Sequence, residues 1–370
     1  AIKHVEREDY SISQVEEEVE VKMHKAIAII QFKLEGQLLI RRKEFHMADR
    51  ALLDDINYEE GTIRLYGKEY NLLDHVFPTV DPENPYELSK EEEEVMERLV
   101  SAFANCEKLQ RHMQLLLKKG SLYKVYNNNL LYHGCVPLNE DGSFKEVEVY
   151  GRTYKGRELY DVLEAYVRKA FFALDKEEKQ RGRDILWFIW SSPSSPLFGK
   201  DKMATFERYF LAEKETHVEN KNPYYRLLED ESVVDNIFRE FGIEGDCCHI
   251  INGHVPVHHT SGESPIKCGG KVLVIDGGFS KAYQKETGIA GYTLIYNSWG
   301  MILAAHEPFT SAEDAITRES DILSDSILVK RTSLRKTVGD TDNGHHLQES
   351  IDELRQLLKA YRNGQIIEKE

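Results

Sequence analysis

Short apolar runs alternate with amphipathic segments between residues 121 and 310, and this alternation restricts the possible folds more than any other feature. Runs rich in β-branched and aromatic residues predict strands: SLYKVYNNNLLYHG, DILWFIWSS, CCHIING, KVLVIDGG and YTLIYNSWGMILAAHE. The segments ELYDVLEAYVRKAFFAL and SVVDNIFREFG have helical spacing, and Gly242 closes the second. Helices mixed among strands favour a layered α/β fold.

Both ends of the chain are predicted to be mainly helical. Before residue 121 lie two long amphipathic segments, and in the second Ser89 is a candidate N-cap, Glu92 completes a capping box and Gly120 is a natural stop. The segment GTIRLYGKEYNLL between them predicts a small hairpin. After residue 310, AEDAITRESDILSDSIL and LQESIDELRQLLKAYRNG predict two helices that flank a polar linker containing GDTDNGHH.

Composition narrows the class of protein. The chain has 370 residues, of which 41% are hydrophobic and 30% charged, as in soluble globular proteins. A formal charge of −16 disfavours non-specific binding to nucleic acid or to anionic membranes. No run approaches the roughly 20 apolar residues of a spanning helix, and no signal-peptide pattern begins the chain. Five scattered cysteines without a CxxC pair predict reduced thiols and a cytoplasmic protein.

Two histidines stand in similar surroundings. His133 in NNNLLYHGCVPL and His254 in CCHIINGHVPVHH each follow an apolar run, adjoin a glycine and precede a proline. Ligand sites in α/β proteins lie at the carboxyl ends of strands, and neutral imidazole is the commonest metal ligand. The pair therefore predicts half of a metal site, and a purely structural role is the alternative for each. His258 and His259 are weaker candidates, because one loop rarely orients three histidines productively.

For the other candidate site residues, a purely structural role is at least as well supported as a role in binding or catalysis. Asp276 in VLVIDGGFS is placed either at an active-site edge or, more simply, in an Asp-Gly-Gly turn. Lys200, Lys202 and Arg208 lie in and after a polar loop and would either bind phosphate oxygens or be exposed. The same applies to Lys221, Tyr224, Tyr225 and Arg226 in KNPYYR. No GxGxxG, P-loop or GxSxG motif is present.

Several of these motifs resemble a known family. HGC at 133–135, ILW at 185–187, GHVPV at 253–257 and IDGG at 275–278 occur in the order seen in calcineurin-like metallophosphoesterases. More narrowly, DILWFIWSSPSSPLFGKDKMATFERYF, ETHVENKNPYY and INGHVPV resemble the class 3 fructose-1,6-bisphosphatases of Firmicutes, over nearly the whole chain. The resemblance implies hydrolysis of a sugar bisphosphate at a two-metal site, usually with manganese. His133 and His254 match two late ligands of that site, whose cations would supply a hydroxide for attack on phosphorus.

The early ligand motifs of that superfamily, DxH, GDxxD and GNH, do not occur here after a predicted strand. We therefore expect the chain to be the C-terminal portion of such an enzyme, inactive alone, with its catalytic residues upstream. In this interpretation residues 1–120 are a helical insertion, 121–310 the second half of a metallophosphoesterase-type layered α/β core, and 311–370 a helical tail.

Two alternatives from other functional classes remain. One is a calcineurin-like phosphoesterase acting on phosphoprotein or dinucleoside polyphosphate, and the other is a non-catalytic scaffold module. A homo-oligomer is also left open, because apolar residues in the terminal helices would serve either a dimer or the cover of a missing half.

Overall fold

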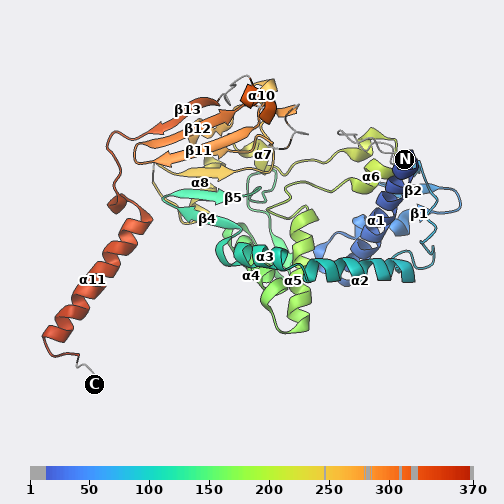
Figure 1. Cartoon of the computed structure of the whole chain (residues 1–370), viewed down its shortest axis with the longest axis horizontal. Coiled ribbons are helices and arrows are strands. Elements are labelled where there is room, and N and C mark those ends of the chain that lie inside the picture. The colour runs from blue at the N-terminus through green and yellow to red at the C-terminus, as the bar shows by residue number, and fades with distance from the viewer. Residues whose placement is uncertain are drawn as a thin grey trace. The chain divides into compact units, whose positions relative to one another are not determined.

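A computed structural model describes residues 14–366 apart from 246, 279, 281–283, 285, 308–310 and 318–323. Within these residues the chain is a mixed α/β structure that divides into two compact units (Figure 1). The first unit comprises the described residues up to Ser121, with Pro137–Asn139 and Phe144–Asn222. The second comprises Leu122–Val136, Glu140–Ser143 and the described residues from Pro223 onward. No described helix combines the length and apolar character needed to cross a membrane.

Helices dominate the first unit: α1 (Gln14–Arg41), α2 (Lys90–Ala104), α3 (Glu107–Lys119), α4 (Gly156–Phe172), α5 (Lys176–Ser191) and α6 (Thr205–Phe210). The predicted capping box begins α2, because the Ser89 hydroxyl accepts from the Glu92 N–H at 3.3 Å and the Glu92 carboxylate accepts from the Ser89 N–H at 2.8 Å. The single helix predicted to follow is in fact two, since α2 ends at Ala104 and α3 begins at Glu107. Gly120 then ends α3, as predicted.

The strand predicted for DILWFIWSS is wrong, because this segment is the second half of α5. Asp175 caps that helix by accepting a hydrogen bond from the Glu178 N–H at 2.9 Å. The buried residues Ile185, Phe188 and Ile189 then follow at helical spacing. Helix α5 packs on α4, and a Cβ at Gly182 would come within 2.3 Å of an α4 backbone nitrogen. Packing on α4 therefore outweighs the local preference of these aromatic and β-branched residues for a strand.

The remaining elements of the first unit are small. The hairpin predicted for GTIRLYGKEYNLL is confirmed as β2 and β3, with β1 added at one edge. Aromatic side chains of α1 and α6, among them Phe32, Phe206 and Phe210, pack in one core cluster with this sheet. The strands are β1 (Ile56–Asn57), β2 (Thr62–Leu65), β3 (Lys68–Asn71), β6 (Val147–Val149) and β7 (Arg152–Tyr154). The short 3-10 helices, labelled η, are η1 (Lys43–Phe45), η2 (Ala48–Arg50), η3 (Leu52–Asp55) and η4 (Lys214–His217).

A five-stranded sheet organises the second unit, in the order β4-β5-β8-β10-β9. The predicted strands in NNLLYHG, CCHIING and KVLVIDGG are confirmed as β5, β8 and β10, which run parallel to one another. The outer strands are antiparallel to their neighbours: β4 pairs with β5, and β9 pairs with β10. The elements are β4 (Tyr123–Tyr126), β5 (Asn129–Tyr132), α7 (Tyr224–Leu227), α8 (Glu231–Glu240), β8 (His249–Asn252), η5 (His259–Ser261), β9 (Ile266–Lys267), η6 (Cys268–Gly270) and β10 (Val272–Val274).

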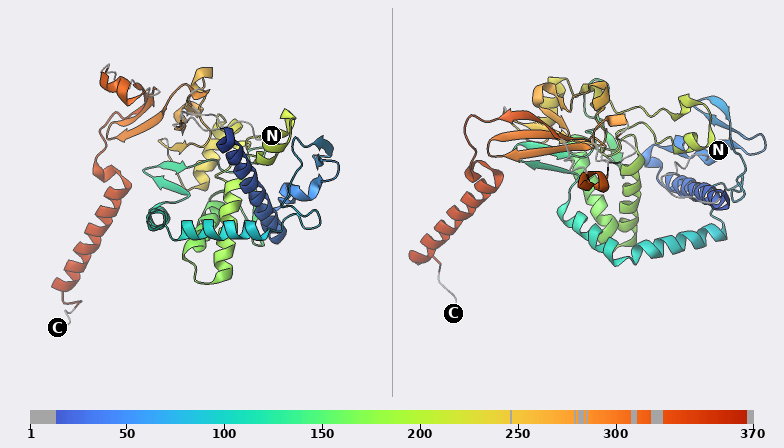
Figure 2. Two further views of the ribbon diagram at one scale, coloured as in Figure 1. Left: turned by 45° about the vertical axis from the view of Figure 1, so that its right-hand side comes forward. Right: turned by 45° about the horizontal axis from the view of Figure 1, so that its top comes forward.

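A second, antiparallel sheet packs on the first through Ile251, Leu273 and Met301 (Figure 2). Its strands are β11 (Gly291–Asn297), β12 (Gly300–His306) and β13 (Ser324–Arg331), and α10 (Ala312–Thr317) lies between the last two in sequence. The helix predicted for SDSIL is wrong, because these residues pair with β12. The linker predicted for GDTDNGHH is wrong as well, because η7 (Val338–Asp340) and the start of α11 (Asp342–Arg362) occupy it.

Candidate functional site

Three neighbouring parallel strands bring the candidate residues of the second unit to one edge of the sheet. His133 follows β5, Asn252 ends β8 and precedes Gly253 and His254, and Asp276 lies two residues beyond β10. Backbone hydrogen bonds continue past the strand ends, from the Gly253 N–H to the His133 carbonyl at 2.9 Å and from the Ile275 N–H to the Asn252 carbonyl at 2.8 Å. We call His133, Asn252, His254 and Asp276 the carboxyl edge. Its position agrees with the usual ligand-binding edge of α/β sheets.

The two histidines predicted as metal ligands lie in direct contact. Nε2 of His133 is 3.0 Å from Nδ1 of His254, and the ring centroids are 4.8 Å apart. The His133 ring is exposed and the His254 ring is half-buried, so solvent reaches the pair. His254 has φ of +69°, a left-handed conformation that costs a non-glycine residue about 1 kcal/mol. The turn after β8 therefore holds this imidazole against a local conformational preference.

A shared hydrogen bond between imidazoles requires one nitrogen to carry the proton and the other to accept it. When that proton shifts to the other nitrogen of its own ring, both nitrogens offer lone pairs to one small region of space. Converging imidazole lone pairs are what a divalent transition-metal ion binds. The pair is thus suited to hold a cation.

Asn252 is a further polar group at the carboxyl edge that the sequence reasoning missed. Its side chain is 2% exposed, and its Nδ2 donates to the Gly134 carbonyl at 3.0 Å. Its Oδ1 is buried and has no hydrogen-bond partner among the described residues. An unpaired buried acceptor costs free energy, so it favours a ligand or water that donates to it. The signal was present in the sequence, because Asn252 directly precedes Gly253 and His254.

Asp276 both forms a turn and lies at the edge of the sheet, the two alternatives that its sequence context suggested. Its Oδ1 accepts the Gly278 N–H at 3.0 Å, which is the turn contact expected of Asp-Gly-Gly. It nevertheless lies at the carboxyl edge, since its Oδ2 is 3.6 Å from the position that a Cβ on Gly253 would take. His258 and His259 are exposed in the turn that follows, and η5 begins at His259.

The described residues supply only part of a metal site. Among them, no group of three or more His, Cys, Asp or Glu side chains is arranged to hold a metal ion. The imidazole pair fits as two ligands, with an amide oxygen and a carboxylate nearby as oxygen donors. A complete site would need ligands besides these two histidines.

The three cations predicted to bind phosphate lie in the first unit, where each contacts a polar group of the protein. Lys200 and Arg208 approach Glu219 at 2.8 and 3.1 Å, and Lys202 donates to the Tyr66 hydroxyl at 2.6 Å. Burial opposes ionisation of Glu219, but the Lys200 hydrogen bond and the Ala204 N–H outweigh it and lower the pKa. These contacts hold the loop after α5 to the segment around Glu219. The prediction that the cations bind substrate stays a prediction.

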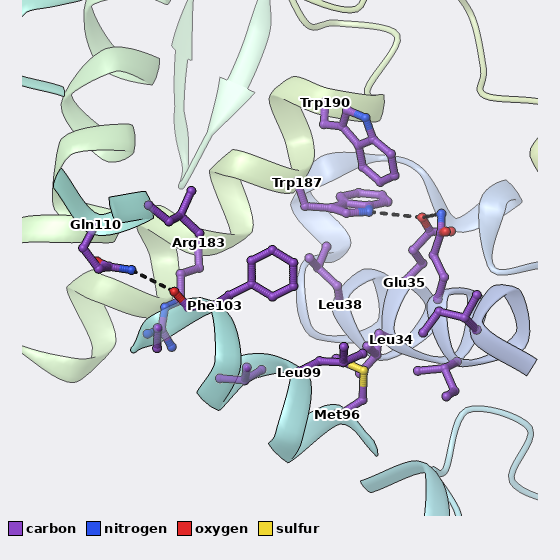
Figure 3. Close-up of a pocket in the computed structure, with 16 residues that line it drawn as sticks. Leu34, Glu35, Leu38, Met96, Leu99, Phe103, Gln110, Arg183, Trp187 and Trp190 are labelled. Atoms are coloured by element: carbon purple, nitrogen blue, oxygen red, sulfur yellow. Dashed lines mark hydrogen bonds between the residues drawn. The ribbon is translucent and has the colours of Figure 1, made fainter. Parts of the chain in front are cut away.

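A cavity of about 790 Å³ opens in the first unit between α1, α2, α3 and α5 (Figure 3). Its walls are apolar, with Leu34, Leu99, Phe103 and both tryptophans of α5 among them. The Glu35 carboxyl accepts from Gln31 Nε2 at 3.0 Å and from Trp187 Nε1 at 3.5 Å. Burial raises the pKa of Glu35. A sugar bisphosphate needs several cations, and of the lining residues only Arg183 is one, so this cavity is not the phosphate site.

Fold and site together define a mixed α/β protein with a candidate metal-binding edge on parallel strands. The chain belongs to the Firmicute fructose-1,6-bisphosphatase family, whose model matches residues 2–363. It is similar to the class 3 fructose-1,6-bisphosphatases of Clostridioides difficile, with 57% identity over 97% of this chain and 55% of that protein. Similar values hold for the relatives from Clostridium botulinum strain Loch Maree, with 55% identity over 97% and 54%, and Listeria innocua, with 54% over 94% and 53%.

The resemblance to the class 3 fructose-1,6-bisphosphatases, predicted from DILWFIWSSPSSPLFGKDKMATFERYF, ETHVENKNPYY and INGHVPV, is confirmed by these matches. The chain spans about half the length of the curated relatives it matches. That the chain is the C-terminal portion of a longer enzyme stays a prediction. No solved structure matches the chain.

Proposed function

We propose that this protein takes part in the metal-dependent hydrolysis of fructose 1,6-bisphosphate to fructose 6-phosphate and phosphate, and that His133 and His254 bind the metal. The observation that carries the proposal is the 3.0 Å contact between their ring nitrogens at the ends of parallel strands. Family membership supports the substrate and favours it over a phosphoprotein or a dinucleoside polyphosphate. It equally disfavours a non-catalytic scaffold.

The donor set suits manganese, the metal implied by the family resemblance. The imidazole nitrogens, with the Asp276 carboxylate and the Asn252 Oδ1 at the same edge of the sheet, provide both nitrogen and oxygen donors. A bound divalent cation would polarise phosphoryl oxygens and lower the pKa of a bound water. The residues of the chain position the site: the Gly253 N–H fixes the His133 backbone, and Asn252 Oδ1, which has no partner among the described residues, can accept a hydrogen bond from water or a sugar hydroxyl. We infer that β5, β8 and β10 belong to a metallophosphoesterase-type core.

Metal content of the purified protein tests the ligand assignment. After growth in manganese-supplemented medium, His133→Ala and His254→Ala should each lose at least about half of the bound metal, because each removes one of two imidazole ligands. The matched control is His346→Ala, an exposed histidine on α11. Wild-type metal content in both edge variants would overturn the assignment.

Phosphate release tests the activity independently. Expressed at the full length of its gene, the protein should release phosphate from fructose 1,6-bisphosphate faster than from phosphoserine peptide or diadenosine tetraphosphate, under the same manganese concentration. A preference for either of the other two substrates would contradict the proposed function. It would leave the ligand assignment in place.

The cation proposal has its own test. If Lys200 and Arg208 exchange Glu219 for a substrate phosphate, Arg208→Gln should raise KM about tenfold with little change in kcat, the loss of roughly one charge-assisted hydrogen bond. An unchanged KM would assign these cations to loop structure alone. A cytoplasmic location, expected from the thiols, stays a prediction.

A further inference from the structure

A small polar pocket lies where β5 and β8 begin, at the opposite end of these strands from the carboxyl edge. Asn129 and His249 are the first residues of the two parallel strands and are paired in register. A strand rises about 3.3 Å per residue, so His249 lies roughly 10 Å from Asn252. We call this the amino-end pocket, and the residues of its lining used below are Asn129, His249, Lys330, Thr332 and Lys336.

The two lysines of the pocket come from the second sheet and from the segment that follows it. Lys330 in β13 lies directly opposite Met301, whose side chain is buried against the first sheet. Directly opposite residues share a face of the sheet, so Lys330 is turned toward the first sheet as well. After β13 the chain folds back on the β11–β12 turn, where the Lys336 N–H donates to the Ser298 carbonyl at 2.9 Å. Backbone hydrogen bonds therefore hold both lysines at the pocket.

The positive charge of the pocket is not balanced by the described part of the chain. Both lysines are half-buried, and neither forms an ion pair with a described carboxylate. Lys336 acts on Asp340 at longer range, but the Asp340 carboxylate accepts from the Thr337 N–H and hydroxyl, each at 2.8 Å. The Thr332 hydroxyl oxygen is buried and has no hydrogen-bond partner among the described residues. A bound anion would relieve the repulsion between the lysines and would give this hydroxyl an acceptor.

His249 determines which kind of anion fits. Asn129 Nδ2 donates to two backbone carbonyls at 3.1 and 3.0 Å, so the amide oxygen is the atom that faces His249 Nδ1 at 3.1 Å. The proton of the neutral imidazole therefore lies on Nδ1, and Nε2 presents a lone pair. Burial, with Lys330 and Lys336, lowers the pKa of His249 to about 4, so the ring is neutral at pH 7. The pocket thus combines cationic donors with one hydrogen-bond acceptor.

We propose that the amino-end pocket binds inorganic phosphate. The two lysines and the Thr332 hydroxyl donate to phosphate oxygens, and the hydroxyl of the phosphate donates to His249 Nε2. At neutral pH inorganic phosphate keeps at least one hydroxyl, whereas sulfate has the same shape and none, so a sulfate oxygen would face the Nε2 lone pair. The pocket is small, about 20 Å³ against about 790 Å³ for the cavity of the first unit, and this space admits one small ion.

Isothermal titration calorimetry tests the site. Protein expressed at the full length of its gene, in phosphate-free buffer with a chelator, should bind phosphate with a Kd below about 1 mM. Lys330→Met and Lys336→Met should each raise the Kd about tenfold, because each removes one charge-assisted hydrogen bond. Arg331→Met is the matched control, since it removes the same charge from the opposite face of β13 and should change the Kd less than about twofold. No binding by the wild type, or an unchanged Kd in both lysine variants, would overturn the proposal.

Anion selectivity tests the role of His249 and needs no variant of the lysines. At pH 7.5 the wild type should bind phosphate at least about tenfold more tightly than sulfate, because only phosphate can donate to Nε2. His249→Gln carries an amide that can donate at the same place, so its affinities for the two anions should agree within about threefold. Equal affinity of the wild type for both anions would overturn the assignment to phosphate. Because neither titration contains metal or measures hydrolysis, both outcomes are independent of the proposed phosphatase function.

Discussion

The helical core of the first unit and the carboxyl edge of the second differ in how their polar side chains are paired. In the helical core, Asp184 is 1% exposed and accepts hydrogen bonds from Arg41 at 2.7 Å, Arg42 at 2.7 Å and Gln180 at 2.9 Å. At the carboxyl edge, His133 is exposed and Asn252 Oδ1 lacks a partner among the described residues. Groups that the chain itself satisfies stabilise the fold. Groups that it leaves open are available to a ligand.

Removing Asp184 should have the largest effect on stability. Asp184→Ala leaves two arginines facing a site without a counter-charge and should lower the free energy of unfolding by about 3–5 kcal/mol. Urea unfolding at pH 7 measures it. Asp161→Ala is the matched control, since Asp161 pairs with Arg157 at 3.7 Å on an exposed helix surface and should cost less than about 0.5 kcal/mol. Equal losses in the two variants would remove the distinction between satisfied core and open edge.

The two ends of β8 repeat the comparison on a single strand. His249 at its start is buried and bonded to Asn129 Oδ1 at 3.1 Å, and burial, with Lys330 and Lys336, lowers its pKa to about 4. The folded state favours the neutral imidazole. The contribution of His249 to the free energy of unfolding is therefore complete above the ordinary pKa of 6.5 and is lost as pH falls toward 4. Between pH 7 and pH 5 the wild type should lose about 2 kcal/mol more stability than His249→Gln. Parallel losses would show that His249 is not held neutral.

Glu35 should give a smaller effect with the opposite dependence on pH. Because burial raises its pKa, the protonated carboxyl is the form that the fold favours, and stability is lost as pH rises through the folded-state pKa. Glu35→Gln keeps an acceptor for Trp187 and should stabilise the protein by roughly 0.5–1 kcal/mol at pH 7. It should have little effect at pH 4, where the wild-type carboxyl is protonated as well. Thermal unfolding at both pH values measures the effect. A variant less stable than the wild type at pH 7 would contradict the prediction, because the charged carboxylate would then be the form that the fold favours.

The smallest effect is expected at the carboxyl edge itself. His133→Ala removes one exposed hydrogen bond and should change the unfolding free energy of the metal-free protein by less than about 1 kcal/mol. Urea unfolding in the presence of a chelator measures it. A loss comparable with that of Asp184→Ala would make His133 a structural residue and weaken its assignment as a ligand.

Local signals in the sequence predicted much of the fold. Three features depend on interactions within a few residues, so the amino-acid sequence alone predicts them. They are the Ser89 capping box, the hairpin of β2 and β3, and the ends of β5, β8 and β10. The position of both histidines at strand ends follows from the same local pattern.

Elements whose form depends on distant partners were misjudged. The LWFIW segment has strand-forming residues, yet the cap at Asp175 and the close approach of Gly182 to α4 make it a helix. SDSILVKR has spacing compatible with a helix, yet β12 offers it a ladder of hydrogen bonds. The polar stretch before α11 joins the helix because Thr341 caps it at the Gly344 N–H, 3.1 Å away.

By itself, the sequence determined the α/β class, the strands that precede His133 and His254, and membership of a fructose-1,6-bisphosphatase family, because each resides in short runs of residues. Only the tertiary structure decided that ring nitrogens of the two histidines lie 3.0 Å apart, that Asn252 at the same sheet edge has an oxygen without a partner among the described residues, and that the large apolar side chains of α11 are exposed. The physical reason is that contact and burial depend on which distant segments meet, and strand pairing across more than a hundred residues sets both.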